Sequence, residues 1–167
     1  MTLFSKIDLK NIPNHICVIM DGNGRWAKIL GKERTFGHQK GIQSVKKILE
    51  ESLKLGVKHL TLFAFSKENW ERPTYEVKMI MKLLSKSILK YQKTLIENDV
   101  KLNTIGDLND LPLDSKHAIE QVQKITNKNK KITLTIALSY SSRWEITNSI
   151  KNIISDFKQK KFNTKNI

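Results

Sequence analysis

Short apolar runs of strand length alternate along the chain with longer segments of helical periodicity. The runs predict strands at residues 16–20, 60–65, 100–105 and 132–138. Between and after them, apolar residues recur at three- and four-residue spacing, most regularly over 77–95. Alternating strands and helices are typical of a parallel sheet with right-handed crossovers. We therefore predict a single α/β domain over residues 1–167, with one mainly parallel sheet flanked on its faces by helices.

Local signals predict where the helices begin and end. Gly56 is expected to stop the second helix, Thr74 to cap the long third helix, and Asp114 or Ser115 to cap the fourth. The fourth helix is expected to turn inward Ala118, Val122 and Ile125. The last helix is predicted from Ile146, Ile150, Ile153, Ile154 and Phe157.

Two segments lack a regular apolar pattern. Residues 31–41 combine glycines with Lys32, Arg34 and Lys40, and we expect a mobile basic segment. His38 in this segment is suited to donating to a phosphate or shuttling a proton. The tail over 158–167 is basic and shows no clear periodicity.

Composition narrows the class of protein. With 39% hydrophobic and 28% charged residues, the 167-residue chain fits a globular domain. No apolar run approaches the length that spans a bilayer, and residues 1–6 lack the apolar centre of a signal peptide. Cys17 is the only cysteine, and we expect it to pack as a small hydrophobe. A cytoplasmic location follows by default.

The formal net charge of +14 favours anionic partners such as diphosphates, acidic lipids or nucleic acid. Zinc-finger, RNP and homeodomain patterns are absent from the sequence, which argues against nucleic acid. Each of the three tryptophans lies within two residues of an arginine, after a strand-like run. A guanidinium group matches phosphate oxygens bidentately, so these strand-end loops are candidates for binding phosphate.

The first strand ends in Asp21-Gly22-Asn23-Gly24, and a helix is predicted from Arg25. A strand, a glycine-rich loop and a helix together offer backbone N–H groups to an anion. Asp21 adds a possible metal ligand, so the loop is suited to a diphosphate and its cation. It matches neither a Walker loop nor the dinucleotide fingerprint, and a plain strand-to-helix turn remains the alternative.

The second strand ends in a loop, residues 66–73, that is rich in polar groups. With the first loop, it makes the sequence resemble the cis-prenyltransferases, most closely the bacterial undecaprenyl diphosphate synthases. The matching residues are 15–26, Gly31, Arg34, 36–38, Gly41, 65–66, 68–70, 72–73, 76–77, 105–107, Tyr140 and 143–146. The resemblance covers almost the whole chain.

The resemblance implies a parallel sheet flanked by helices, with an apolar tunnel for a growing polyprenyl chain. The pattern over 77–95 alone favours a core helix, and the resemblance makes it a tunnel wall as well. The implied reaction is the repeated, Mg²⁺-dependent addition of isopentenyl diphosphate to farnesyl diphosphate with cis geometry. The product would be a long-chain carrier lipid for cell-wall synthesis. A homodimer and a peripheral contact with the inner face of the membrane are also implied.

The resemblance also implies roles for individual residues. Asp21 would hold Mg²⁺ on a diphosphate, and Asn69 stands at the position of the proton acceptor. The allylic diphosphate would be bound by Gly22, Asn23, Gly24, Arg25, Arg34 and Arg72. The rest of the substrate pocket would be formed by Trp26, His38, Ser66, Lys67, Glu68 and Trp70. A neutral amide is a poor base, so our hypothesis is that Asn69 orients substrate while a diphosphate oxygen takes the proton.

Three departures from the family bear on activity. Ser141 and Ser142 replace paired glycines, and Lys67 replaces a small or polar residue. The family's closing segment, which carries an Arg-x-Ser cluster for isopentenyl diphosphate, a glutamate for the metal and much of the dimer contact, has no match. We therefore expect a C-terminally incomplete domain that binds an allylic diphosphate with Mg²⁺ but condenses poorly unless a second chain completes the site. The alternatives are a diphosphate-cleaving phosphatase or nucleotidase, and an inactive remnant or basic anion-binding module.

Overall fold

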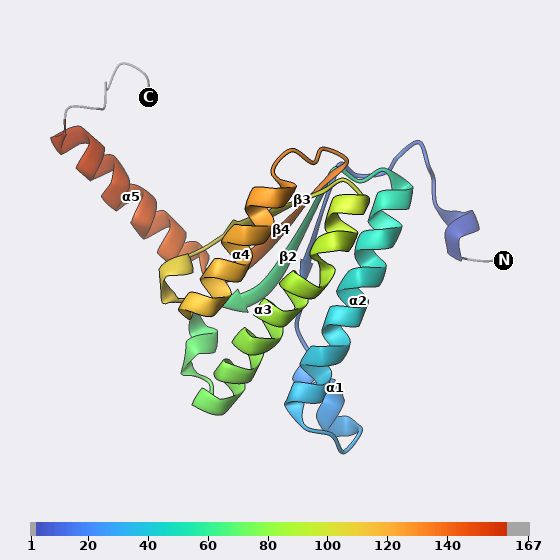
Figure 1. Ribbon diagram of the computed structural model, residues 1–167, viewed down its shortest axis with the longest axis horizontal. Helices are drawn as coiled ribbons and strands as arrows, with labels where there is room; N and C mark the ends of the chain where they lie inside the picture. The colour runs from blue at the N-terminus through green and yellow to red at the C-terminus, as the bar shows by residue number, and fades with distance from the viewer. Residues whose placement is uncertain (1–2, 160–167) are drawn as a thin grey trace.

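The computed structural model describes residues 3–159 (Figure 1). Most of the predicted basic tail lies outside this range. The strands are β1 (His15–Ile19), β2 (His59–Ser66), β3 (Val100–Ile105) and β4 (Ile132–Tyr140). The α-helices are α1 (Asn23–Ile29), α2 (Arg34–Leu55), α3 (Thr74–Glu97), α4 (Leu113–Thr126) and α5 (Ser142–Lys158). The predicted strands are all confirmed, with ends displaced by at most two residues.

The strands form one parallel sheet in the order β1-β2-β4-β3. Leu62 of β2 lies beside Val18 of β1, and Leu134 of β4 lies between Leu60 and Leu102 of the adjacent strands. These side chains pack against α3 and α4 through buried residues such as Met81, Ile88, Ile119 and Val122. The core therefore lies between the sheet and the helices that follow β1, β2 and β3.

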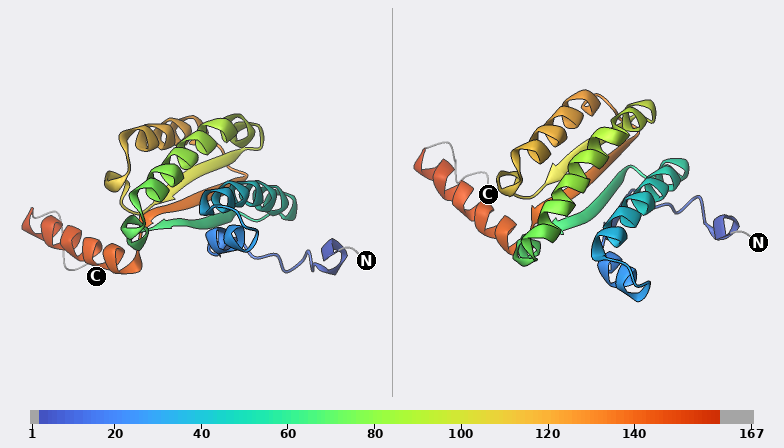
Figure 2. Two further views of the ribbon diagram at one scale, coloured as in Figure 1. Left: turned by 90° about the horizontal axis from the view of Figure 1, so that it is seen from below. Right: turned by 60° about the horizontal axis from the view of Figure 1, so that its bottom comes forward.

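Helices α2, α3 and α4 lie on the same side of the sheet (Figures 1 and 2). The predicted parallel sheet flanked by helices is thus confirmed, and these three helices cover one of its two faces in the described residues. On β1, Cys17 and the 74%-exposed Ile19 point to the open face, so the prediction that Cys17 packs inside is wrong. Helix α5 projects from the end of β4, and none of its residues is buried. Because α5 leads away from the sheet, its apolar stripe is exposed.

The segment predicted to be mobile is helical from Arg34 onward. A Cβ at Gly37 would lie 2.0 Å from the carbonyl oxygen of Asn23, so this glycine lets α2 approach the chain at the start of α1. Tight packing rather than flexibility explains the glycine. Gly56 ends α2 in the left-handed region at φ 78°, as predicted.

Other predicted helix ends are corrected by the structure. Pro73 and Pro112 stand at the N-caps of α3 and α4, and neither Thr74 nor Asp114 caps a helix. Ser115 lies inside α4, where its buried hydroxyl approaches Ser85 at 2.8 Å. The inward face of α4 contains Ala118, Ile119 and Val122, while Ile125 is 44% exposed. No helix among residues 3–159 is long and apolar enough to cross a membrane.

Candidate functional site

A cavity of about 230 Å³ lies between α2, α3 and the sheet. Its walls are apolar and include Leu49 and Val45 from α2, Leu84 and Ile88 from α3, and Leu134 from β4. Helix α3 is thus a core helix and a cavity wall at once. Many of its polar groups come from the loops after β1 and β2 and from the first turns of α2, which meet at the carboxyl edge of the sheet. Lys46 of α2 and Ser87, Tyr91 and Thr94 of α3 add further polar groups.

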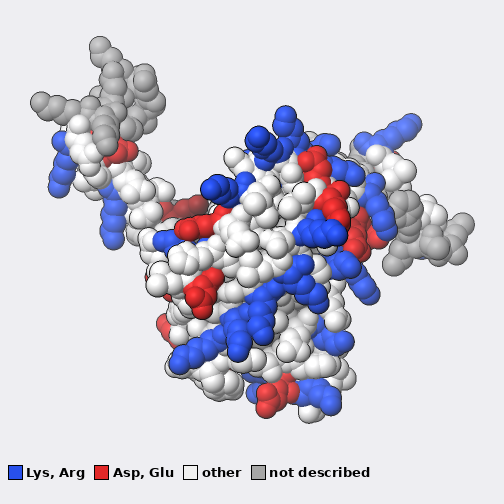
Figure 3. Space-filling view, in the orientation of Figure 1, with Lys and Arg blue, Asp and Glu red and all other residues white. Residues whose placement is uncertain are grey.

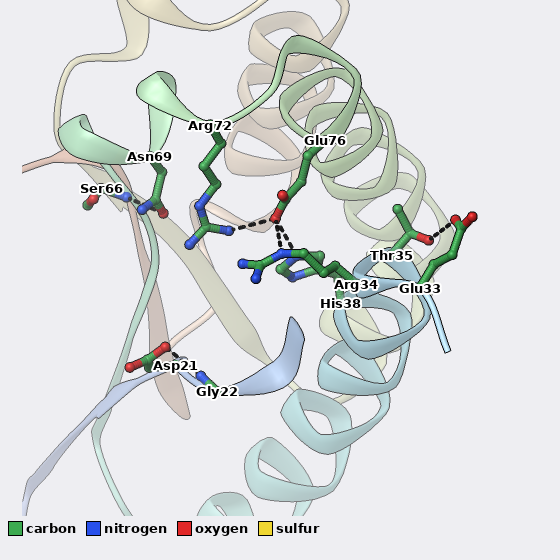
Figure 4. Close-up of polar contacts among 10 residues, drawn as sticks. All are labelled: Asp21, Gly22, Glu33, Arg34, Thr35, His38, Ser66, Asn69, Arg72 and Glu76. Carbon is green, nitrogen blue, oxygen red and sulfur yellow. Dashed lines mark hydrogen bonds and ion pairs between the residues drawn. The ribbon is translucent and has the colours of Figure 1, made fainter. Parts of the chain in front are cut away.

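The most concentrated charges at this edge surround Glu76, in the first turn of α3 (Figure 4). Its Oε1 accepts from Arg34 Nε at 3.0 Å and from Arg72 Nη1 at 3.1 Å, and His38 Nε2 lies 3.3 Å away. The Glu76 side chain is 4% exposed, whereas those of Arg34 and Arg72 are 33% and 29% exposed. One buried carboxylate therefore holds three basic side chains from two elements, and leaves their remaining N–H groups available to a ligand.

The cluster shifts the pKa values of its members. Burial raises the pKa of Glu76, but hydrogen bonds from Arg34 and His38 and the charges of both arginines outweigh it, so the pKa is lower than usual. Burial lowers the pKa of His38 and exceeds the opposing effect of Glu76. At neutral pH the cluster therefore consists of one anionic carboxylate, two guanidinium cations and a mostly neutral imidazole.

The loop after β1 contributes a second group. Gly22 takes φ 85° before α1, and its N–H donates to Asp21 Oδ1 at 2.5 Å. Arg25 Nη2 donates to Asp21 Oδ2 at 2.8 Å, and both side chains are more than two-thirds exposed. The hydrogen bond from the Gly22 N–H lowers the pKa of Asp21 most, and the hydrogen bond from Arg25 lowers it further. A Cβ at Gly24 would lie 3.0 Å from Arg34 Cζ, so the glycine leaves room for that guanidinium beside the loop.

Asp21 is the carboxylate that could hold a metal here. Among residues 3–159, no group of three His, Cys, Asp or Glu side chains could enclose an ion. Mg²⁺ commonly binds through one or two carboxylates, several waters and substrate phosphates. An exposed single carboxylate beside arginines fits that mode, and would need oxygen ligands from a substrate.

Some residues of the loop after β2 line the cavity, and others contact the ends of β3 and β4. Asn69 and Arg72 line the cavity, and Asn69 Oδ1 accepts from the N–H of Ser66 at 3.2 Å. Lys67 turns away, with Nζ 2.9 Å from Asp107 and 2.7 Å from Asp110. Trp70 donates to Ser139 Oγ at 2.9 Å. The loop is therefore fastened to the ends of β3 and β4 while it presents two polar groups to the cavity.

The structure brings most of the predicted site residues together. The cavity lining includes Asp21, Gly22, Asn23, Gly24, Arg25, Arg34, His38, Asn69 and Arg72. Outside the lining lie Trp26, Ser66, Lys67, Glu68 and Trp70. Trp26 instead stacks on Phe36 with ring centroids 5.9 Å apart. The substrate-binding and catalytic roles of both groups stay predictions.

The sequence alone predicted no role for Glu76. Two signals point to it: it stands four residues after Arg72, the spacing of an ion pair on one helix face, and it falls beside Val77 on the apolar stripe. A charged residue on a buried stripe requires partners, because an isolated buried charge is costly.

The comparisons with known proteins agree on one family. A family model described as "Putative undecaprenyl diphosphate synthase" matches residues 19–167. An isoprenyl transferase of Chlorobaculum tepidum is 47% identical over 89% of this chain and 56% of its own length. One from Fusobacterium nucleatum is 46% identical over 90% of this chain and 65% of its own. The chain thus spans less than two-thirds of the length of these curated relatives.

Solved structures show the same relationship. Lavandulyl diphosphate synthase from Lavandula x intermedia, in complex with dimethylallyl diphosphate, superposes with a TM-score of 0.88 at 29% identity. The match covers 93% of this chain and 66% of that one. A probable undecaprenyl diphosphate synthase from Campylobacter jejuni gives a TM-score of 0.72 at 30% identity, covering 87% of this chain and 63% of that one.

Proposed function

This chain belongs to the family of undecaprenyl diphosphate synthases, the cis-prenyltransferases, and we propose that it binds an allylic diphosphate. The diphosphate would lie among Arg34, His38 and Arg72, and the hydrocarbon chain would enter the apolar cavity. The observation that carries the proposal is this juxtaposition of a basic cluster and an apolar cavity at the carboxyl edge of the sheet. A prenyl diphosphate has the same division into a charged head and an apolar tail.

Two relatives support the choice of substrate. A protein of Pasteurella multocida, 40% identical over 93% of this chain, is named a ditrans,polycis-undecaprenyl-diphosphate synthase specific for (2E,6E)-farnesyl diphosphate. The Lavandula synthase was solved with dimethylallyl diphosphate. Both ligands are allylic diphosphates, and we take farnesyl diphosphate as the substrate to test.

The proposed chemistry is ionisation of the bond between the allylic carbon and the diphosphate, followed by attack of the isopentenyl diphosphate double bond on the allylic carbon. The resulting cation loses a proton to an oxygen of the released diphosphate, which forms the new double bond. The leaving diphosphate gains negative charge, which Arg34 and Arg72 are placed to stabilise. Asp21 would hold Mg²⁺, which supplies further charge stabilisation on the diphosphate oxygens. Asn69 would orient the second substrate, and the apolar walls would exclude water from the reacting carbon.

Repeated condensation to a long-chain polyprenyl diphosphate is the activity that family membership suggests. For this chain we propose the part of that reaction for which the described residues carry the groups, the binding of the allylic substrate. The supporting observation is that the basic cluster and the apolar cavity both lie within the described residues.

Two measurements test the proposal. Calorimetric titration with farnesyl diphosphate and Mg²⁺ should give saturable binding that Arg34→Ala weakens, and no binding by the wild-type chain would refute the assignment. Incorporation of radiolabelled isopentenyl diphosphate measures condensation separately: polyprenyl product would show that the chain also carries out the later steps. Release of inorganic phosphate without chain growth would indicate a phosphatase instead.

A further inference from the structure

The outer face of α3 carries a regular row of lysines. Lys78, Lys82, Lys86 and Lys90 recur every four residues and are exposed, and Lys93 extends the row. At 100° per residue these side chains fall within an arc of about 120°. In the space-filling view, basic side chains form a diagonal band over the front of the molecule, where Figure 1 places α3 (Figure 3).

Carboxylates do little to offset this row. Among the described residues, no ion pair forms with Lys78, Lys82 or Lys86. Lys93, at the end of the row, pairs with Glu97 at 3.7 Å. Helix α2 pairs two of its four lysines with glutamates, Lys46 with Glu50 at 3.6 Å and Lys54 with Glu51 at 2.7 Å. Like charges four residues apart destabilise a helix by about 0.2–0.5 kcal/mol per pair. The row is therefore unfavourable in the isolated chain, and an anionic partner would remove the repulsion.

Apolar side chains lie among the lysines on the same arc. Tyr75, Met79, Leu89 and Ile96 are 65%, 42%, 37% and 46% exposed. A surface that mixes lysines with exposed apolar residues is suited to the boundary between lipid headgroups and acyl chains. Nucleic-acid surfaces more often combine basic groups with stacking aromatic rings, and Tyr75 is the one aromatic residue on this exposed arc of the described helix.

We propose that the outer face of α3, residues 75–96, docks on an anionic phospholipid bilayer. The lysines would contact headgroup phosphates, and Met79, Leu89 and Ile96 would insert at the level of the glycerol backbone. Because Leu84 and Ile88 on the inner side of α3 line the cavity, the docked helix would separate the cavity from the membrane by its own thickness. The inference goes beyond the proposed function and does not depend on it.

The first test is co-sedimentation of the full chain with unilamellar vesicles. Vesicles of phosphatidylcholine with about one-third phosphatidylglycerol should bind the protein, and pure phosphatidylcholine should bind it much less. The triple variant Lys78→Glu, Lys82→Glu, Lys86→Glu should lose on the order of 100-fold in affinity. The matched control is Lys58→Glu, Lys151→Glu, Lys158→Glu, which removes the same charge from exposed positions elsewhere and should lose less than tenfold.

A second measurement reports on the face itself. In a Cys17→Ser background, an environment-sensitive fluorophore on Leu89→Cys should shift to the blue on anionic vesicles, while one on Lys124→Cys of α4 should not. Three results would overturn the inference: no binding to anionic vesicles, equal losses in the two triple variants, or tighter binding to duplex RNA than to vesicles of equal phosphate content. Titrating the same samples with farnesyl diphosphate distinguishes a failure to bind vesicles from a failure to bind the proposed substrate.

Discussion

Replacing Glu76 with glutamine tests the electrostatic centre of the candidate site. The amide keeps the shape of the side chain and one acceptor oxygen, but it removes the negative charge between Arg34 and Arg72. Breaking a fully buried ion pair costs about 3–5 kcal/mol. Here both guanidinium groups are about one-third exposed, so water screens them, and we expect a loss of about 1–3 kcal/mol.

The assay is thermal unfolding of the unliganded chain. For a domain of this size, 1 kcal/mol corresponds to about 2–4 °C in Tm, so Glu76→Gln should lower Tm by roughly 3–10 °C. Glu97→Gln is the matched control, because Glu97 lies on the same helix but is 59% exposed and pairs with Lys93 at the longer distance of 3.7 Å. It should change Tm by less than about 2 °C.

Ligand and pH separate the electrostatic explanation from a packing defect. Inorganic diphosphate supplies negative charge where the variant has lost it, so it should raise the Tm of Glu76→Gln more than that of the wild type. The pKa of Glu76 is lowered in the folded chain, so its contribution is present above about pH 4.5 and is lost as pH falls further. Equal Tm losses in Glu76→Gln and Glu97→Gln, or equal stabilisation of variant and wild type by diphosphate, would refute this reasoning.

Three further predictions concern the surroundings of the site. Gly37→Ala should destabilise the chain by about 2–3 kcal/mol and weaken farnesyl diphosphate binding, since its Cβ would meet the Asn23 carbonyl; chemical denaturation measures the loss, with Gln39→Ala at an exposed position of the same helix as the control. Because the folded chain lowers the pKa of His38, wild type should lose stability relative to His38→Gln as pH falls below about 6.5; Tm values that stay parallel from pH 8 to 5 would contradict it. Lys67→Met should leave Asp107 and Asp110 without their shared cation and cost about 1–2 kcal/mol in denaturant unfolding, whereas Lys28→Met, on exposed α1, should be neutral.

The pattern of apolar positions was sufficient to predict the strands and the long helices. Residues 60–65 and 77–95 show how strongly a buried strand and an amphipathic helix mark a sequence. The start of α2 was missed because Gly37 and Gly41 suggest flexibility, while in the structure they permit close packing against Asn23. Periodicity within a segment carries no information about which neighbour will face it.

The site was predictable where residues act through short loops. Asp21 to Arg25 and Asn69 to Arg72 follow strand ends, and parallel strands bring such ends together. Glu76 was missed because its role depends on Arg34 and His38, which lie about forty residues earlier. The open face of the sheet was missed for a similar reason: alternation along β1 shows two faces, but it does not show how many helices return to cover each.

All residues that line the cavity lie between Met20 and Ile136. The last wall, β4, is also the last strand of the described chain. Since polypeptides emerge from the ribosome N-terminus first and fold as they emerge, every wall of this cavity has been synthesised before the first residue of α5. All the residues that enclose the cavity are therefore available to fold while the remainder of the polypeptide is still being translated.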